Sequence, residues 1–156
     1  MSLIACAALT GILFLASWFD IKSRKIPNRL IVLGIFLGIA VNALGSFPGH
    51  FYSGILGFVL GFGLMLVPYC FGLLGAGDVK LFAVVGLFLG ADNILDALVY
   101  TVLCGGVLAL IYLFRIAMAK IRKVDSAEKV NQPTLPYAVA ISGGTLLTLF
   151  FIASDI

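Results

Sequence analysis

The distribution of apolar residues constrains this chain more than any other feature of its sequence. Long hydrophobic runs follow one another along the chain, separated by short polar connections. Most of these runs reach the ~17–25 residues that an α-helix needs to cross a hydrocarbon core about 30 Å thick. The sequence therefore predicts an all-α fold, a polytopic membrane protein with six transmembrane helices. The apolar stretches are Ser2–Phe19, Leu30–Phe47, Phe51–Phe71, Val79–Ala91, Ala97–Ala119 and Pro136–Ala153.

The composition agrees with a lipid-embedded chain. Hydrophobic residues make up 62% of the sequence and charged residues only 11%, whereas soluble domains average about 45–50% and about 25%. The polar side chains are too few to cover a surface exposed to water, so the bilayer must act as the solvent. We expect one membrane-embedded domain over residues 1–156, without a soluble appendage.

The basic residues predict the orientation in the membrane. With six spans, all ten Lys and Arg residues fall on one side, where an excess of positive charge marks the cytoplasmic face. We therefore expect a protein of the inner (cytoplasmic) membrane with both termini on the outer side. The asymmetric distribution of basic residues accounts for the net charge of +3, which requires no nucleic acid partner. The basic positions are Lys22, Arg24, Lys25, Arg29, Lys80, Arg115, Lys120, Arg122, Lys123 and Lys129, and the opposite connections carry His50, Asp92, Asp96 and Asp155.

The cysteines suggest neither a metal site nor a disulfide framework. Cys6, Cys70 and Cys104 are spread over three spans without a paired spacing. His50 is predicted in a connection on the outer side, away from the cytoplasmic face. We therefore predict no metal and no cofactor.

Two aspartates at the cytoplasmic edge are the main candidates for chemistry. Ionisable groups near the hydrocarbon are costly and are by default functional candidates. Asp20 lies at the inner end of the first span, and Asp78 follows a glycine-flanked turn and opens the fourth. The fourth stretch has 13 residues, which cover only about 20 Å as a helix. Asp78 is therefore expected some way inside the membrane core, or the bilayer thins locally, provided that the helix does not continue past Asp92 to Asp96.

Two carboxyl groups that are close together in a low-dielectric cleft share a proton and titrate as a pair. Such a pair provides a base that activates water and an acid that protonates the substrate. We expect Asp78, at a helix start, to be the ionised partner and Asp20, near a helix end, the protonated one. Other roles stay open: Asp78 as a helix N-cap and Asp20 as a solvated interfacial residue.

Three sequence elements resemble those of one protein family. The segment from Asp20 to Asn28 reads D-I-K-S-R-K-I-P-N, and the segment from Gly75 to Leu81 reads G-A-G-D-V-K-L. A third element, L-P-Y-A-V-A, starts at Leu135. In this order, and over six spans, they resemble the two aspartate segments and the final-span motif of the type IV prepilin peptidases. The resemblance covers essentially the whole chain.

The resemblance implies a membrane-embedded aspartyl endopeptidase of the G-x-G-D type. Such enzymes cut the short basic leader from prepilins after a glycine, at the cytoplasmic face. Asp20 and Asp78 carry over as the catalytic pair, and the implied partners are prepilins with a cationic leader and an apolar helix. The larger members also methylate the new N-terminus through an added segment with paired cysteines, which this sequence lacks. It is more similar to the short peptidases of tight-adherence (Flp) pilus systems or to archaeal preflagellin peptidases, so methylation is not expected.

Residues next to the second aspartate are supporting candidates. Gly75 and Gly77 should permit a close backbone approach that a Cβ atom would block. Lys80 lies two residues beyond Asp78, about 200° around an ideal helix, so an ion pair between them is not assured. Lys80 either extends to the membrane interface or tunes the pair and positions substrate.

The other motif residues have structural as well as substrate-binding interpretations. Pro27 is expected to keep the first inner loop from becoming helical, and Asn28 to cap the helix that follows. Pro136 suits the first turn of the last span, followed by Tyr137. All four are candidates for contact with substrate.

The alternative function is a small proton- or metal-ion-coupled membrane transport or cation-binding subunit that uses the same two aspartates. No acidic residue at mid-depth of another span would complete a path across the membrane, and no internal repeat is visible. The sequence therefore favours the peptidase, and it leaves the oligomeric state and the identity of the pilin open.

Overall fold

The computed structural model describes residues 3–44, 48–121 and 137–154, and every secondary-structure element in these ranges is an α-helix. Four helices are long and apolar enough to cross a membrane, and α2, with 17 residues, is shorter. The predicted all-α membrane class is confirmed, whereas the count of six spans stays a prediction. The helices are α1 (Leu3–Ser23), α2 (Asn28–Leu44), α3 (Pro48–Cys70), α4 (Ala76–Ile121) and α5 (Tyr137–Ser154).

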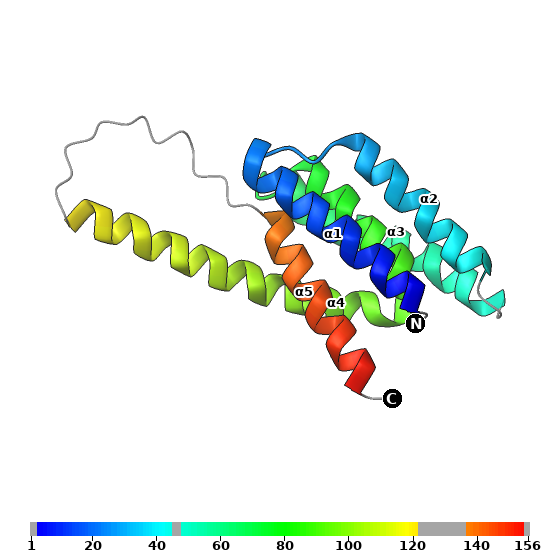
Figure 1. Ribbon diagram of the computed structural model, residues 1–156. Helices are drawn as coiled ribbons and strands as arrows, with labels where there is room; N and C mark the ends of the chain where they lie inside the picture. The colour runs from blue at the N-terminus through cyan, green and yellow to red at the C-terminus, as the bar shows by residue number, and fades with distance from the viewer. Residues whose placement is uncertain (1–2, 45–47, 122–136, 155–156) are drawn as a thin grey trace.

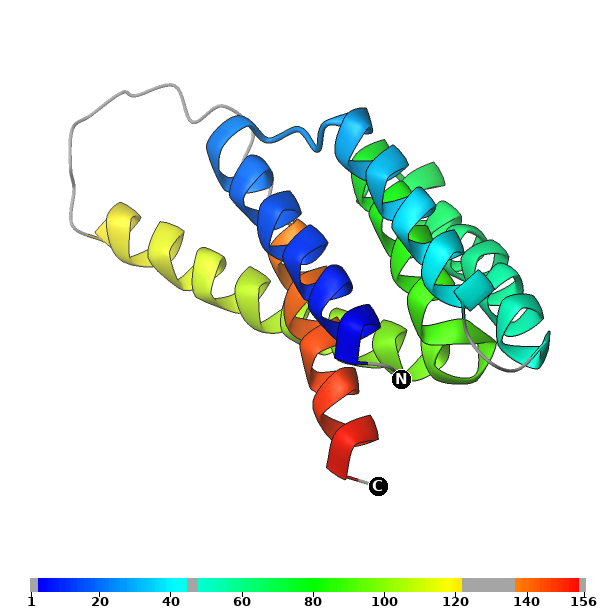
Figure 2. The same cartoon turned by 45° about the vertical axis from the view of Figure 1, so that its right-hand side comes forward.

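The helices form a bundle with two distinct ends (Figures 1 and 2). The start of α1 and the end of α5 lie at one end of the bundle. The end of α1 lies at the other end, together with the starts of α2, α4 and α5. The functional candidates among the described residues lie at the end of α1, in the turn to α2 and at the starts of α2, α4 and α5, so they gather at the end remote from the start of α1 and the end of α5.

The fourth and fifth apolar stretches are joined differently from the sequence prediction. Asp92 and Asp96 were expected in a polar connection, but both lie within α4, which is interrupted only at Gly90 (φ 79°, ψ 175°). This backbone conformation is accessible essentially only to glycine. The Ser53 hydroxyl accepts a hydrogen bond from the Ala91 N–H at 3.1 Å, so helical structure restarts at once without a loop. We call residues 76–89 the first leg of α4 and residues 91–121 the second leg.

The first leg is the core of the bundle. Each residue from Leu81 to Gly90 is buried, which requires neighbouring helices on all sides. Glycines spaced four apart on α3 and α4 make this packing possible, as is typical of helices in lipid. A Cβ atom on Gly86 would collide with the Gly57 backbone carbonyl, and one on Gly61 would come within 2.9 Å of the Phe82 carbonyl oxygen.

The second leg has a packed part and a lipid-facing part. Near its start, Gly144 of α5 lies directly against the backbone of Thr101. Farther along, the second leg projects away from the other helices (Figures 1 and 2) and exposes Val107, Leu110 and Phe114. Apolar side chains are stable in this position because lipid tails are as apolar as they are.

The glycine contact predicts a position-dependent effect on stability. Replacing Gly86 with Val should cost about 1–3 kcal/mol, because the new side chain meets backbone that cannot move aside. Gly63→Val is the matched control, since nothing lies within 4 Å of a Cβ atom at Gly63. Unfolding in mixed micelles with increasing SDS measures both variants. Equal losses of stability would contradict this packing.

Candidate active site

Asp20 and Asp78 come together at one end of the bundle. Asp20 lies in the last turn of α1 and Asp78 in the first turn of α4, and these turns are at the same end (Figure 1). Their carboxyl groups are close enough for the two charges to act on each other. The side chain of Asp20 is only 8% exposed, and that of Asp78 is half-buried. The two candidates therefore form one site, although 58 residues separate them in sequence.

The glycine turn holds the carboxyl group of Asp78. The Gly75 N–H donates to Asp78 Oδ2 at 3.1 Å, and the Asp78 N–H donates to the Gly75 carbonyl oxygen at 3.1 Å. Because α4 begins at Ala76, Asp78 is the third residue of the helix, and its side chain reaches back as the acidic half of a capping box does. A Cβ atom on Gly75 would lie 3.2 Å from the same Oδ2. Glycine thus keeps this carboxyl group uncrowded.

The start of α5 holds the carboxyl group of Asp20. The Ala138 N–H donates to Asp20 Oδ2 at 3.1 Å. This N–H is one of the helix-start groups that have no partner within the helix. Nearby, the hydroxyls of Ser17 and Ser142 lie 2.7 Å apart, which ties α1 to α5 about one turn from Asp20. The first turn of α5 is therefore a third component of the site.

The expected division of the proton is not supported by the helix ends. Asp78 was expected to be the ionised partner because it lies at a helix start. Asp20, however, also accepts a hydrogen bond from a helix start, that of α5. The dipole of α5 therefore opposes that of α1 at Asp20, and the division of the proton between the two carboxyl groups stays a prediction.

The second glycine accommodates the first inner loop. A Cβ atom on Gly77 would lie 3.3 Å from Cβ of Ile26, so the I-P-N element packs directly on the G-x-G-D turn. Pro27 is non-helical, as predicted, and its carbonyl oxygen accepts the N–H of Leu30 at 3.0 Å. The close approach expected of Gly77 thus joins the two aspartate segments.

Asn28 and Lys80 contact each other rather than the aspartate pair. The Asn28 side chain was expected to cap α2, but the hydrogen bond that it makes is with another helix. Its Oδ1 instead accepts a hydrogen bond from Lys80 Nζ at 3.3 Å. Lys80 faces the side of α4 away from Asp78, as its position in the helix predicts. Substrate contact by either residue stays a prediction.

Tyr137 lies close to the aspartate pair. It is the first residue of α5, and its ring packs on Gly105, where a Cβ atom would be 3.2 Å from Cε2. Asp78 lies within electrostatic range of its phenol group. Pro136 lies outside the described residues. The structure therefore brings Tyr137 to the site.

Comparison with known sequences identifies the family. The sequence model of the type IV leader peptidase family matches residues 7–110, which include both aspartates. The chain belongs to the type IV leader peptidase family. Among relatives of this chain, the prepilin leader peptidase/N-methyltransferase of Bacillus subtilis (strain 168) is 30% identical over 156 residues, which cover 97% of this chain and 57% of the relative.

Two further relatives have the same description. The prepilin leader peptidase/N-methyltransferases of Burkholderia pseudomallei strains 1026b and K96243 are each 26% identical over 153 residues, which cover 94% of this chain and 44% of theirs. The chain thus spans about half the length of the curated relatives it matches. No solved structure matches it.

Several residues that shape this candidate site were not among the sequence candidates. Ala138 contributes only a backbone N–H, which has no signature in the sequence. Ile26 was part of a recognised motif but was not singled out. Ser17 and Ser142 could have been found, because a hydroxyl inside an apolar span needs a partner.

The contact between α5 and Asp20 predicts a specific effect of proline. Ala138→Pro removes the N–H that donates to Asp20, and it should cost about 1–3 kcal/mol more than a matched proline. Val139→Pro is that control, because it also lies in the first turn of α5 and imposes the same ring constraint. Unfolding in mixed micelles measures both. Equal destabilisation would show that the contact contributes nothing.

Proposed function

We propose that this protein is an integral membrane aspartyl endopeptidase that removes the short basic leader from type IV prepilins of the Flp type. It cleaves after a glycine, at the cytoplasmic face of the inner membrane. One observation carries the proposal: Asp20 and Asp78 lie at one end of the bundle, within range of each other's charge and each held by a backbone N–H at a helix start, in a chain of the leader peptidase family.

The proposed chemistry uses the two carboxyl groups as one unit. Burial and mutual repulsion favour a single shared proton between Asp20 and Asp78. The ionised carboxylate takes a proton from a water molecule, which attacks the scissile carbonyl carbon. The protonated carboxyl group donates its proton to the substrate, ultimately to the leaving amine. The hydrogen bonds from Gly75 and Ala138 fix the direction of each carboxyl group.

The architecture suits a substrate that is itself anchored in the membrane. A prepilin has a cationic leader followed by an apolar helix, and it can approach laterally through the lipid. Its leader junction then lies at the membrane boundary, where the helix ends carry the aspartate pair. Negative charge on this pair favours the approach of a cationic leader.

The proposed topology counts the two legs of α4 as separate spans, which makes six. The first leg, residues 76–89, is about 21 Å long, so it is shorter than an ~30 Å core. Asp78 would then lie inside the membrane boundary. Both termini, at the opposite end of the bundle (Figure 2), would lie outside.

Membership of the leader peptidase family favours this function over an ion-coupled transporter that uses the same aspartates. The curated relatives are also named as N-methyltransferases. The chain spans about half of their length, and no Cys-x-x-Cys pair occurs in it. Methylation is therefore not part of the proposal.

Conservative replacement of either aspartate should abolish cleavage. Asp20→Asn and Asp78→Asn keep an oxygen that accepts the Ala138 or Gly75 N–H, so both variants should fold and insert. Each should cut a co-expressed Flp-type prepilin at least about 100-fold more slowly, because an amide provides no acid or base. Immunoblotting for the shortened pilin follows the reaction.

The control variant is Asp92→Asn, which changes an aspartate near Gly90, at the opposite end of the bundle. It should retain normal processing. Undiminished cleavage by either dyad variant would remove the catalytic assignment, whereas normal insertion with lost cleavage supports it.

The proposed orientation predicts which residues a membrane-impermeant maleimide reaches. In a background without Cys6, Cys70 and Cys104, Leu44→Cys at the end of α2 should be labelled in intact cells or spheroplasts. Lys25→Cys, in the loop after α1, should be labelled only in inverted vesicles. Both native side chains are exposed, so burial does not account for a difference. The opposite labelling pattern would invert the topology.

A further inference from the structure

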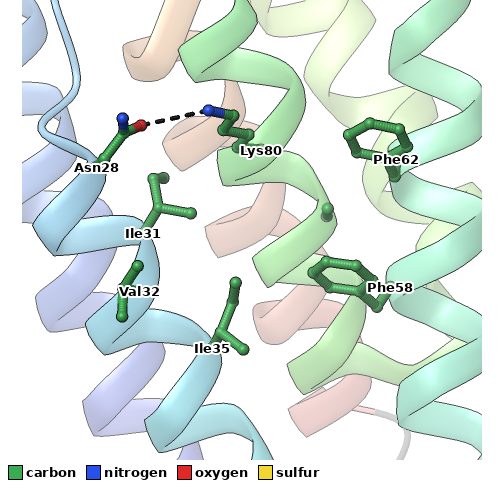
Figure 3. Close-up of a pocket in the computed structure, with 8 residues that line it drawn as sticks. Asn28, Ile31, Val32, Ile35, Phe58, Phe62 and Lys80 are labelled. Atoms are coloured by element: carbon green, nitrogen blue, oxygen red, sulfur yellow. Dashed lines mark hydrogen bonds between the residues drawn. The ribbon is translucent and has the colours of Figure 1, made fainter.

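A groove opens on the side of α4 away from Asp78. It has a volume of about 390 Å³ and lies between α2 and α3, with α4 as its floor (Figure 3). Its position is separate from the aspartate pair, because Lys80 and Asp78 point to nearly opposite sides of α4. The lining residues are Asn28, Ile31, Val32, Ile35, Phe58, Phe62, Lys80 and Ala83.

The groove has the length of a short extended chain. Its α2 wall runs from Asn28 to Ile35, about 10 Å along the helix axis, within a membrane leaflet about 15 Å thick. A flexible hydrocarbon chain fits a space of this length and volume, with its apolar surface against the apolar walls.

The two parts of the groove differ in polarity. Below its mouth the walls are aliphatic and aromatic, with Ile35 and Phe58 deepest from the polar pair (Figure 3). At the mouth, the Lys80 ammonium group donates to the neutral amide oxygen of Asn28. A carboxylate is not its partner in the part of the chain that the structure describes. The positive charge therefore remains available to an anion.

The surroundings of the mouth are also basic. Lys25 lies in the loop before α2, Arg29 follows Asn28 in its first turn, and both are exposed. Basic pockets between membrane helices attract the phosphate groups of anionic lipids. A cationic prepilin leader, by contrast, would be repelled from this mouth.

We propose that the groove binds an acyl chain of an anionic phospholipid, with the lipid phosphate at Lys80. The ammonium group and the Asn28 amide nitrogen provide two neighbouring donors for phosphate oxygens, and the chain lies along Ile31, Ile35 and Phe58. This lipid fills the space between α2 and α3. The inference goes beyond the peptidase function and does not require it.

Tryptophan quenching by brominated lipid chains tests the proposal in the intact protein. The only native tryptophan, Trp18, is replaced by Phe, and Phe62→Trp places a reporter in the groove. Leu60→Trp is the matched reporter on the other side of α3, since Leu60 and Phe62 are 43% and 40% exposed. Brominated phosphatidylglycerol and brominated phosphatidylcholine are compared in phosphatidylcholine bilayers.

We expect the groove reporter to be half-quenched at an about fivefold lower mole fraction of brominated phosphatidylglycerol than of brominated phosphatidylcholine, the effect of one cation near the surface. Lys80→Gln should remove this preference, and Lys22→Gln, which changes an exposed charge at the end of α1, should keep it. The reporter at Leu60 should show no preference.

Two results would overturn the proposal. One is equal quenching of the groove reporter by both lipids. The other is the same anionic preference at both reporters, which would mean a general surface attraction. Equal quenching combined with its relief by a synthetic prepilin segment would assign the groove to substrate instead. Peptidase activity is not measured, so failure here is distinguishable from failure of the proposed function.

Discussion

Burial of residues 81–90 of α4 on every side is the constraint on which the rest of the structure depends. Residues 81–90 are buried without a break. A helix that is buried on every side must be covered by neighbouring helices on every side. In lipid, burial of apolar surface gives little net drive for association, so the packing depends on close backbone contact. Gly57 and Gly61 of α3 and Gly34 and Gly38 of α2 provide the necessary space.

This buried leg also determines where the chemistry is placed. Its N-terminal turn holds Asp78 against Gly75, and its other end, Gly90, redirects the chain into the second leg. The second leg then receives α5 through the contact of Thr101 with Gly144. The start of α5 reaches Asp20 of α1 through the Ala138 N–H. A single series of helix contacts thus connects the two carboxyl groups.

The first turns of α4 present different residues on opposite sides of the helix, which separates the proposed catalysis from the proposed lipid contact. Asp78 lies in the site that α4 shares with α1 and α5. Lys80, two residues later, faces the groove between α2 and α3. The short motif therefore serves two surfaces, because successive helical residues point about 100° apart. In our account one surface carries the proposed dyad and the other the proposed lipid site.

Local sequence patterns predicted the helical class, the position of the two aspartates at the same end of the helices, and the glycine turn. Each of these depends on residues that are close together in the sequence. They did not predict the contact of Ala138 with Asp20, since a backbone N–H has no residue signature and 118 positions separate the two. The polar residues Asp92 and Asp96 suggested a loop. The structure makes the turn with Gly90 alone, because the Ser53 hydroxyl from α3 caps the restarted helix.

The same limit applies to Asn28, Lys80 and Tyr137. The position of Asn28, after Pro27 and before the second apolar stretch, predicted a helix cap, but its side-chain partner, Lys80, comes from another helix, 52 residues away. Tyr137 is placed by its packing on Gly105, which only the turn at Gly90 brings within reach. Tertiary contacts of this kind depend on how the helices cross, and helix periodicity alone does not determine that.

The central claim is that the carboxyl groups of Asp20 and Asp78 converge on one water molecule. A direct measurement uses Asp20→Cys with Asp78→Cys, in a background without the native cysteines, and Cd²⁺ as a soft ion for two thiolates. If the positions converge, the double variant should bind one ion at least about 100-fold more tightly than either single variant. Binding no tighter than that of the single-cysteine variants would show that the two positions are apart, and it would contradict the account.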